Sequence, residues 1–202
     1  MLLFDVGAGA TPTAAPANNI VEAQATIANA TDTTGSATGI SVATAGFNGS
    51  NTNGTLTPSG AAAIFDANST RDSLYGNTAL FNSVIRPSAT LTFTGLDATG
   101  ATAYSFDFFA SRTGVADNRE TEYAVAGSTT VSAFLNASAN VSEITSVSNM
   151  IPAPGGIITL TVDPGPNNNN ATGFYYLGAF RLTTVAVPEP SAAGLRRRRS
   201  AR

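Results

Sequence analysis

The chain has 202 residues, of which 43% are hydrophobic and only 11% are charged, and it contains no Lys, Cys, His or Trp. Without Cys and His it cannot form a Ser-His-Asp triad, a Cys nucleophile, a disulfide or a zinc site of the usual type. Residues 1–186 hold twelve acidic residues against five arginines. An acidic body of this kind argues against nucleic-acid binding, which needs cations to neutralise phosphates.

The first forty residues predict one strand followed by irregular chain. Residues 1–6 form a short apolar run that we expect to be a strand. The run lacks the basic start and longer apolar core of a signal peptide, so no signal peptide is visible in this chain. Residues 7–39 are rich in Ala, Thr, Asn and Gly and predict a long irregular segment with a short helical turn at 20–27.

From residue 40 onwards, apolar and polar residues alternate in short runs, as in half-buried strands. In the run 104–111, for example, Tyr104, Phe106 and Phe108 share one face. The predicted strands are 40–45, 91–94, 104–111, 122–125, 131–136, 142–147, 157–162 and 173–183. Many short strands separated by Gly-, Pro- and Asn-rich turns predict an all-β fold, a jelly-roll-like antiparallel β-sandwich formed by one domain over residues 1–186.

The most polar run of this domain is 111–123. It contains Arg112, Asp117, Asn118, Arg119 and Glu120. Arginine beside Asp or Asn on a loop can grip sugar hydroxyls, and the oxygen atoms can also help to hold a structural Ca²⁺ ion. The alternative is an Arg–carboxylate network that only pins a long loop between two strands. Apart from this Ca²⁺ hypothesis, the sequence predicts no metal and no cofactor.

Tyrosines and asparagines elsewhere add to this candidate ligand site. Tyr75 and Tyr176 supply aromatic faces, and the runs 51–54, 72–77 and 167–170 supply polar loop atoms. Aromatic rings stack on the C–H faces of sugars, whereas amides bind hydroxyls. We therefore add Tyr75 and Tyr176 to the candidate site. The alternative is that one of Tyr175 and Tyr176 lies in the core and that the Asn run 167–170 is a solvated turn.

Residues 187–202 form a separate tail, VPEPSAAGLRRRRSAR. The tail resembles the PEP-CTERM sorting signal of exported bacterial proteins, which is also labelled an ice-binding protein C-terminal domain. The matching residues are Val187, Pro188, Glu189, Pro190, Arg196, Arg197, Arg198 and Arg199. The resemblance implies processing by an exosortase-type enzyme and delivery to the cell envelope or outside the cell. Only residues 191–195 separate the two parts of the motif, too few for the ~20 residues of a bilayer span, so we expect a disordered tail without a stable membrane span.

The body resembles bacterial surface β-sandwiches of the galactose-binding-like or malectin-like type. The segments that carry this resemblance are 4–7, 92–97, 106–123, 135–138 and 164–182. Our first hypothesis is a non-catalytic, exported cell-envelope or extracellular-matrix protein. The alternatives are a carbohydrate-binding module that recognises a polysaccharide and a weak glycan hydrolase. An aromatic patch beside the 112–122 loop would favour the module, whereas two arginines buried in ion pairs would favour the first hypothesis. Two carboxylates facing each other across a cleft would favour the hydrolase.

Overall fold

The computed structural model describes residues 1–188 except residues 22 and 24, and this part of the chain is almost entirely β-structure. Its strands are β1 (Leu2–Val6), β2 (Asn18–Ile20), β3 (Thr26–Ile27), β4 (Ser41–Ala45), β5 (Gly49–Asn51), β6 (Ser73–Phe81), β7 (Val84–Arg86), β8 (Ala89–Thr94), β9 (Thr102–Phe109), β10 (Glu120–Ala126), β11 (Thr130–Asn136), β12 (Thr145–Met150), β13 (Ile158–Pro164), β14 (Tyr175–Leu177) and β15 (Ala179–Ala186). A 3₁₀ helix, η1 (Gly60–Ile64), and a short helix, α1 (Ala67–Arg71), precede β6.

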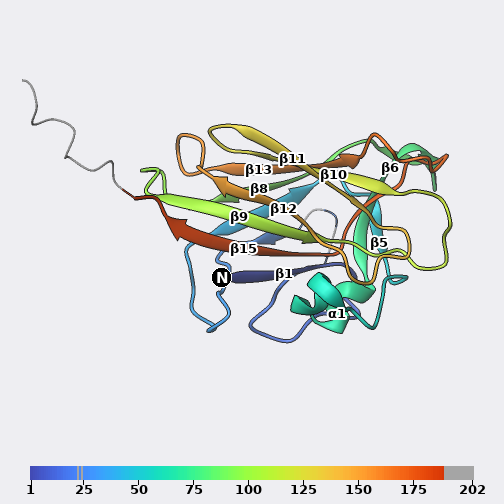
Figure 1. Cartoon of the computed structure of the whole chain (residues 1–202), viewed down its shortest axis with the longest axis horizontal. Coiled ribbons are helices and arrows are strands. Elements are labelled where there is room, and N and C mark those ends of the chain that lie inside the picture. Colours follow the sequence, from blue (N-terminus) through green and yellow to red (C-terminus); the bar gives the residue numbers. More distant parts are fainter. Residues whose placement is uncertain (22, 24, 189–202) are drawn as a thin grey trace, which may run out of the picture.

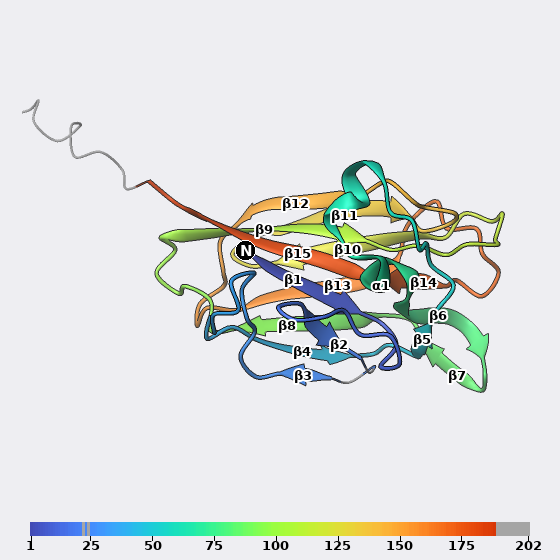
Figure 2. The same ribbon diagram turned by 90° about the horizontal axis from the view of Figure 1, so that it is seen from below.

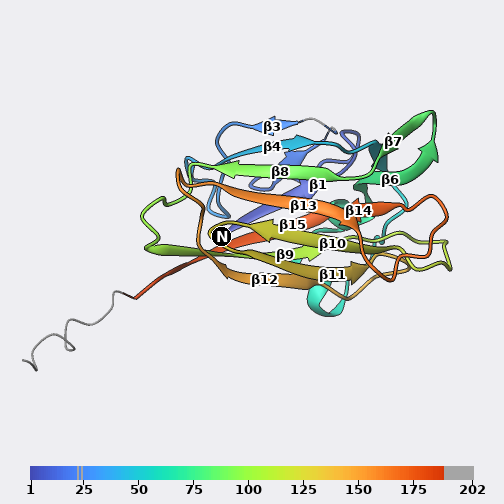
Figure 3. The same cartoon turned by 90° about the horizontal axis from the view of Figure 1, so that it is seen from above.

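Two sheets pack face to face (Figure 1). The first sheet has the strand order β12-β9-β15-β1-β2 and faces the viewer in Figure 2. The second has the order β11-β10-β13-β8-β4-β3 and faces the viewer in Figure 3. Neighbouring strands pair antiparallel throughout, apart from the parallel pair β1–β2. The predicted all-β, jelly-roll-like sandwich is confirmed.

The core lies between these sheets and is rich in phenylalanine. Alternation along β9 places Phe106 and Phe108 on the inner face, as the sequence predicts, and both side chains are fully buried. Phe4 of β1 stacks on Phe180 of β15 with ring centroids 4.3 Å apart, and Phe93 of β8 meets Phe180 edge-on at 5.7 Å. Each such side chain contributes about 1.5–3 kcal/mol by leaving water, so this layer of rings stabilises the sandwich.

A small third sheet sits at one end of the sandwich, on the right in Figure 1. Its order is β14-β6-β5, and β7 pairs with β6 on the side. Helix α1 leads the chain into β6, and the side chain of Asp66 caps the helix by accepting a hydrogen bond from the Asn68 amide. The strands β5, β6 and β14 of this sheet carry side chains into the pocket described below.

The structure corrects two interpretations of the chain before residue 80. In the segment 20–27, predicted as a helical turn, Ile20 ends β2 and residues 26–27 form β3, while residues 22 and 24 lie outside the described residues. β2 pairs with β1, which buries Ile20 in the core. The segment 72–77, interpreted as a polar loop, leads into β6 and forms its first half. Asn77 in this strand is buried, and its amide donates hydrogen bonds to the carbonyls of Ala79 and Val84. Internal hydrogen bonding explains how so polar a segment forms a strand.

The C-terminal prediction 173–183 is also corrected, because it covers two strands in different sheets. The chain leaves β14 at Gly178, whose amide donates to the carbonyl of Phe109, and continues as β15. Of the sorting motif, only Val187 and Pro188 fall within the described residues, and both are exposed. Glu189, Pro190 and the four arginines 196–199 lie outside them. In the described part of the chain, no helix combines the length and apolar character that a bilayer span requires.

Candidate functional site

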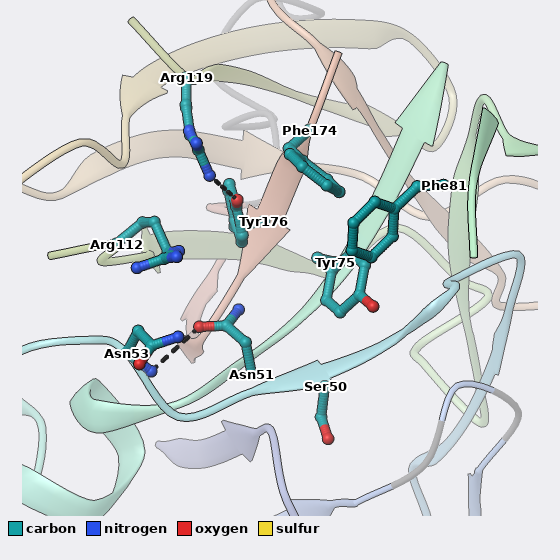
Figure 4. Close-up of a pocket in the computed structure, with 9 residues that line it drawn as sticks. All are labelled: Ser50, Asn51, Asn53, Tyr75, Phe81, Arg112, Arg119, Phe174 and Tyr176. Carbon is teal, nitrogen blue, oxygen red and sulfur yellow. Dashed lines mark hydrogen bonds between the residues drawn. The ribbon is translucent and has the colours of Figure 1, made fainter. Parts of the chain in front are cut away.

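An open pocket of about 280 Å³ lies where the small sheet meets the loop between β9 and β10. Figure 4 shows this pocket with four aromatic rings along one side and mainly polar groups along the other. Its lining residues are Ser50, Asn51, Asn53, Tyr75, Phe81, Arg112, Arg119, Phe174 and Tyr176.

The aromatic side of the pocket is a cluster of four rings, the aromatic wall: Tyr75, Phe81, Phe174 and Tyr176. Phe81 and Phe174 meet edge-on with centroids 4.9 Å apart, and Tyr75 meets Phe174 in the same way at 5.6 Å. Tyr75, Phe81 and Phe174 are only half-buried, whereas Tyr176 is 2% exposed. The wall therefore has a packed base and a solvent-facing surface that a ligand can cover.

Strand alternation explains how the sequence FYYL, residues 174–177, supplies two of the four rings of this wall. Phe174 and Tyr176 point toward the pocket, while Tyr175 between them points into the core and is fully buried. Gly76 opposite Tyr175 leaves room for that ring, because a Cβ atom there would lie 2.0 Å from it. Gly173 turns the chain into β14 with φ of +62°, a conformation that glycine adopts without strain.

Arg119 is held in the pocket by charge, hydrogen bonds and rings. Its Nε donates to both carboxylate oxygens of Asp117 at 3.1 Å, and its Nη1 donates to the Tyr176 hydroxyl at 2.5 Å. The guanidinium carbon also lies 5.4 Å from the centre of the Phe174 ring, within range of a cation–π contact. Partial burial opposes ionisation of Asp117, but hydrogen bonds from Asn170 and Arg119 outweigh it and lower its pKa. Asp117 is therefore ionised at neutral pH and neutralises Arg119.

Arg112 lies across the pocket from Tyr75 and Phe81 and close to Tyr176, where its charge partly offsets the rise in pKa that burial causes (Figure 4). Its backbone is fixed because its amide donates to the Ala137 carbonyl at 2.7 Å and its carbonyl accepts from the Ala139 amide at 2.9 Å. Its Nη1 donates to the Thr113 carbonyl at 2.6 Å. Within the described part of the chain, Arg112 forms no ion pair, so it brings an uncompensated positive charge to the pocket.

Two polar groups at the pocket besides Arg112 remain available for a ligand. The Asn51 amide is occupied, since it donates to Ser73 and accepts from the Asn53 backbone. In contrast, the Asn53 side-chain amide and the Tyr75 hydroxyl have no hydrogen-bonding partner among the described residues. Partial burial raises the pKa of Tyr75, and burial above all raises that of Tyr176, so both hydroxyls are protonated at neutral pH. The pocket thus presents donors and acceptors beside apolar rings.

The Asn run 167–170 braces the pocket loop. Asn168 donates to the carbonyls of Glu120 and Phe174, and Asn170 donates to Asp117. Asn118 exchanges hydrogen bonds with Asn169, and the Glu120 carboxylate accepts two hydrogen bonds from Asn167. Asn167 and Asn169 are exposed, as expected for a solvated turn, and the run also ties the β13–β14 loop to the β9–β10 loop.

The structure brings together four of the seven predicted site residues: Arg112, Arg119, Tyr75 and Tyr176 all line the pocket. Asp117 accepts a hydrogen bond from Arg119 and orients it. Asn118 and Glu120 take part in the hydrogen bonds that join the β9–β10 loop to the Asn run 167–170, which we call the loop brace. The prediction omitted Phe81, Phe174 and Ser50, and it treated Asn51 and Asn53 only as polar loop atoms. Even spacing was the missed signal for Phe174, which is two residues from Tyr176. Phe81 had no such signal, because the register of β6 shifts between Asn77 and Phe81.

The hypothesis of a Ca²⁺ ion in the 112–122 loop does not fit these contacts. The Asp117 carboxylate is paired with the Arg119 cation, and the Glu120 carboxylate accepts from Asn167. A Ca²⁺ site instead gathers six to eight oxygen atoms around one point. Among the described residues, no group of three or more His, Cys, Asp or Glu side chains is placed to hold a metal ion.

No protein-family model and no curated protein matches the chain. One similar solved structure is TmCBM61 in complex with beta-1,4-galactotriose, with a TM-score of 0.32 and 14% identity over 56% of this chain and 70% of that chain. Another is a family 35 carbohydrate binding module from an environmental isolate, with a TM-score of 0.30 and 16% identity over 72% of this chain and 93% of that chain. Neither similarity is strong enough to assign a family or a ligand.

Proposed function

We propose that this chain is a non-catalytic carbohydrate-binding protein and that the pocket beside the β9–β10 loop is its sugar site. One observation carries the proposal: an aromatic wall with exposed ring surface lies across an open pocket from unpaired polar groups (Figure 4). The carbohydrate-binding alternative is thereby preferred to an exported structural protein without a ligand site.

A sugar ring matches both sides of such a pocket. Its axial C–H groups form an apolar face that packs on aromatic rings, and its hydroxyls need donors and acceptors in one plane around it. Tyr75 offers both, because its ring is half-buried and its hydroxyl is free among the described residues. The volume of about 280 Å³ is near the low end of small-molecule pockets, which span roughly 300–1,000 Å³. This size suits a short stretch of sugar.

The pocket does not supply the groups of the alternative hydrolase. Glycoside hydrolysis uses two carboxyl groups on either side of the scissile bond. None of the nine described residues that line this pocket is an acid, and the nearest carboxylate in the hydrogen-bond network, Asp117, is bound to Arg119. Binding without cleavage is therefore the function that this chemistry supports.

Calorimetric titration of the full chain against a panel of neutral and acidic polysaccharides tests the proposal. We expect at least one polysaccharide to bind, and Tyr75→Ala to weaken that binding about tenfold, equivalent to ~1.4 kcal/mol. Phe134→Ala is the matched control, because Phe134 is an exposed aromatic residue on β11 outside the pocket. The proposal fails if no polysaccharide binds or if both variants lose affinity equally.

We also propose, from the tail sequence alone, that the protein acts in the cell envelope or outside the cell. Val187–Pro190 and Arg196–Arg199 support this localisation through their resemblance to a sorting signal. An exosortase-type enzyme would be the partner for processing. Fractionation of cells that express the full chain tests the localisation, and a tail variant with Pro188, Glu189 and Pro190 replaced by alanine serves as control. Equal distribution of both proteins would contradict it.

A further inference from the structure

The two arginines of the pocket differ in charge balance. Arg119 is neutralised by Asp117, whose carboxylate contacts Arg119 Nε at 3.1 Å. Arg112 has no carboxylate partner within the described part of the chain, and its observed side-chain hydrogen bond goes to the neutral carbonyl of Thr113. Since no acid lines the pocket, the lining carries one uncompensated positive charge.

This charge is held in a defined place. The backbone of Arg112 forms an isolated β-bridge with Ser138: its amide donates to the Ala137 carbonyl, and its carbonyl accepts from the Ala139 amide. The loop is fixed from the other side by Asn53, whose carbonyl accepts from the amide and hydroxyl of Thr113. A guanidinium on a braced backbone loses less conformational freedom on binding than one on a mobile loop, which favours an anionic ligand.

Guanidinium chemistry narrows the choice of anion. The planar fork of arginine matches a carboxylate through two parallel N–H···O bonds. Arg112 faces Tyr75 and Phe81 of the aromatic wall across the pocket (Figure 4). A ligand that fills the space between them needs an apolar ring face on one side and a carboxylate at its edge. A hexuronic acid has both features.

We propose that this pocket selects acidic sugars, with the carboxylate of a hexuronate paired to Arg112 while its ring packs on the aromatic wall. The inference rests on the proposed carbohydrate binding of the same pocket and names its ligand class. Arg119 contributes less to this selectivity, since Asp117 already satisfies its charge and Tyr176 receives one of its donors.

The test compares a trigalacturonate with its fully methyl-esterified form by calorimetric titration of the full chain. The ester retains the ring and hydroxyls but has no charge. We expect the acid to bind about 10- to 100-fold more tightly than the ester, as for a charge-assisted bidentate contact. Raising the salt concentration should weaken the acid's binding and leave the ester's unchanged.

Arg112→Gln should remove the preference, so that acid and ester bind within about threefold of each other. Arg86→Gln is the matched control, because it removes the same charge from an exposed arginine on β7 outside the pocket. The control should keep the full preference.

The outcomes separate this inference from the proposed function. If the ester binds as tightly as the acid, or if Arg112→Gln keeps the preference, the acidic ligand class is wrong while sugar binding stands. If a sulfated trigalactoside binds more tightly than the uronate, the assignment to a carboxylate is also wrong. If no sugar of the wider polysaccharide panel binds, the proposed function itself fails.

Discussion

Two aromatic clusters at different places in the molecule share residue types and ring spacings but differ in what covers them. In the sandwich core, Phe4, Phe93 and Phe180 pack with centroids 4.3–6.4 Å apart and are at most 1% exposed. At the end of the sandwich, the aromatic wall has centroid distances of 4.9–6.4 Å, yet Tyr75, Phe81 and Phe174 keep exposed surface beside an unpaired arginine. The comparison separates rings that are buried in the core from rings that keep a solvent-facing surface at the pocket.

The largest expected contrast is in stability. Phe180→Ala removes a fully buried ring and should lower the free energy of unfolding by about 3–5 kcal/mol. Phe81→Ala removes a half-buried ring at the pocket and should cost at most ~1 kcal/mol. Urea unfolding of both variants measures the difference. Equal costs would mean that the aromatic wall is simply a second core.

The next contrast is between two aspartates whose pKa values shift in opposite directions. Asp5 on β1 is 3% exposed, and burial together with nearby Asp72 raises its pKa to about 6. Asp117 beside Arg119 has a lowered pKa. Because the folded chain holds the Asp5 proton more tightly than the unfolded chain, Asp5 lowers stability as pH rises from about 4 to about 6, by up to ~3 kcal/mol.

Asp5→Asn should therefore gain stability relative to the wild type across that pH range, from little at pH 4 to the full effect by pH 7. Urea unfolding at pH 4, 5, 6 and 7 measures this difference. Asp117→Asn should show the opposite trend: stability from Asp117 is present above its unfolded pKa and is lost as pH falls through its lower folded pKa. A difference for Asp5→Asn that does not change with pH would contradict the assignment.

A smaller effect is expected where a carboxylate only positions a pocket residue. Asp117→Asn should reduce the affinity for a neutral sugar, such as the methyl-esterified trigalacturonate, about tenfold, because Arg119 loses the ion pair that orients it, and should cost under ~1 kcal/mol of stability. Asp107→Asn is the matched control, since Asp107 forms a similar ion pair with Arg181 outside the pocket. Affinity measured by calorimetry should fall in the first variant alone, and a loss in both would indicate a general effect of charge.

The smallest effect is expected at Glu120. This residue belongs to the predicted site but binds Asn167 in the loop brace and does not line the pocket. Glu120→Gln should leave sugar affinity within about twofold of the wild type. An affinity loss as large as that of Asp117→Asn would place the ligand over the loop brace and not over the aromatic wall.

The sandwich was predictable from the sequence because its inner strands alternate clearly. In β9, Tyr104, Phe106 and Phe108 occur at every second position, and all three are buried. β6 was missed, since Gly76 and Asn77 suit turns better than strands in the absence of context. Contacts with distant parts of the chain make this segment a strand: Asn77 hydrogen-bonds to Asn48 and Val84, and Gly76 leaves room for the Tyr175 ring of β14.

The candidate site was predictable in composition but not in layout. The polar run 111–123 and the tyrosines identified Arg112, Arg119, Tyr75 and Tyr176. The sequence could not show that Asp117 would neutralise one arginine and leave the other uncompensated, because that depends on how a long loop folds back on itself. Nor could it show that the Asn run 167–170 would brace the same loop, since these partners lie about fifty residues away.

The most direct test of the central claim is to locate a bound sugar on the molecule. Amide chemical shifts of the isotope-labelled full chain can be followed during titration with the polysaccharide fragment that binds best. We expect the largest shifts at 50–53, 75–81, 112–119 and 174–176, with the sheet faces unchanged. Shifts centred on the outer face of either sheet, with the residues around Tyr75 and Arg112 silent, would contradict the assignment of the pocket.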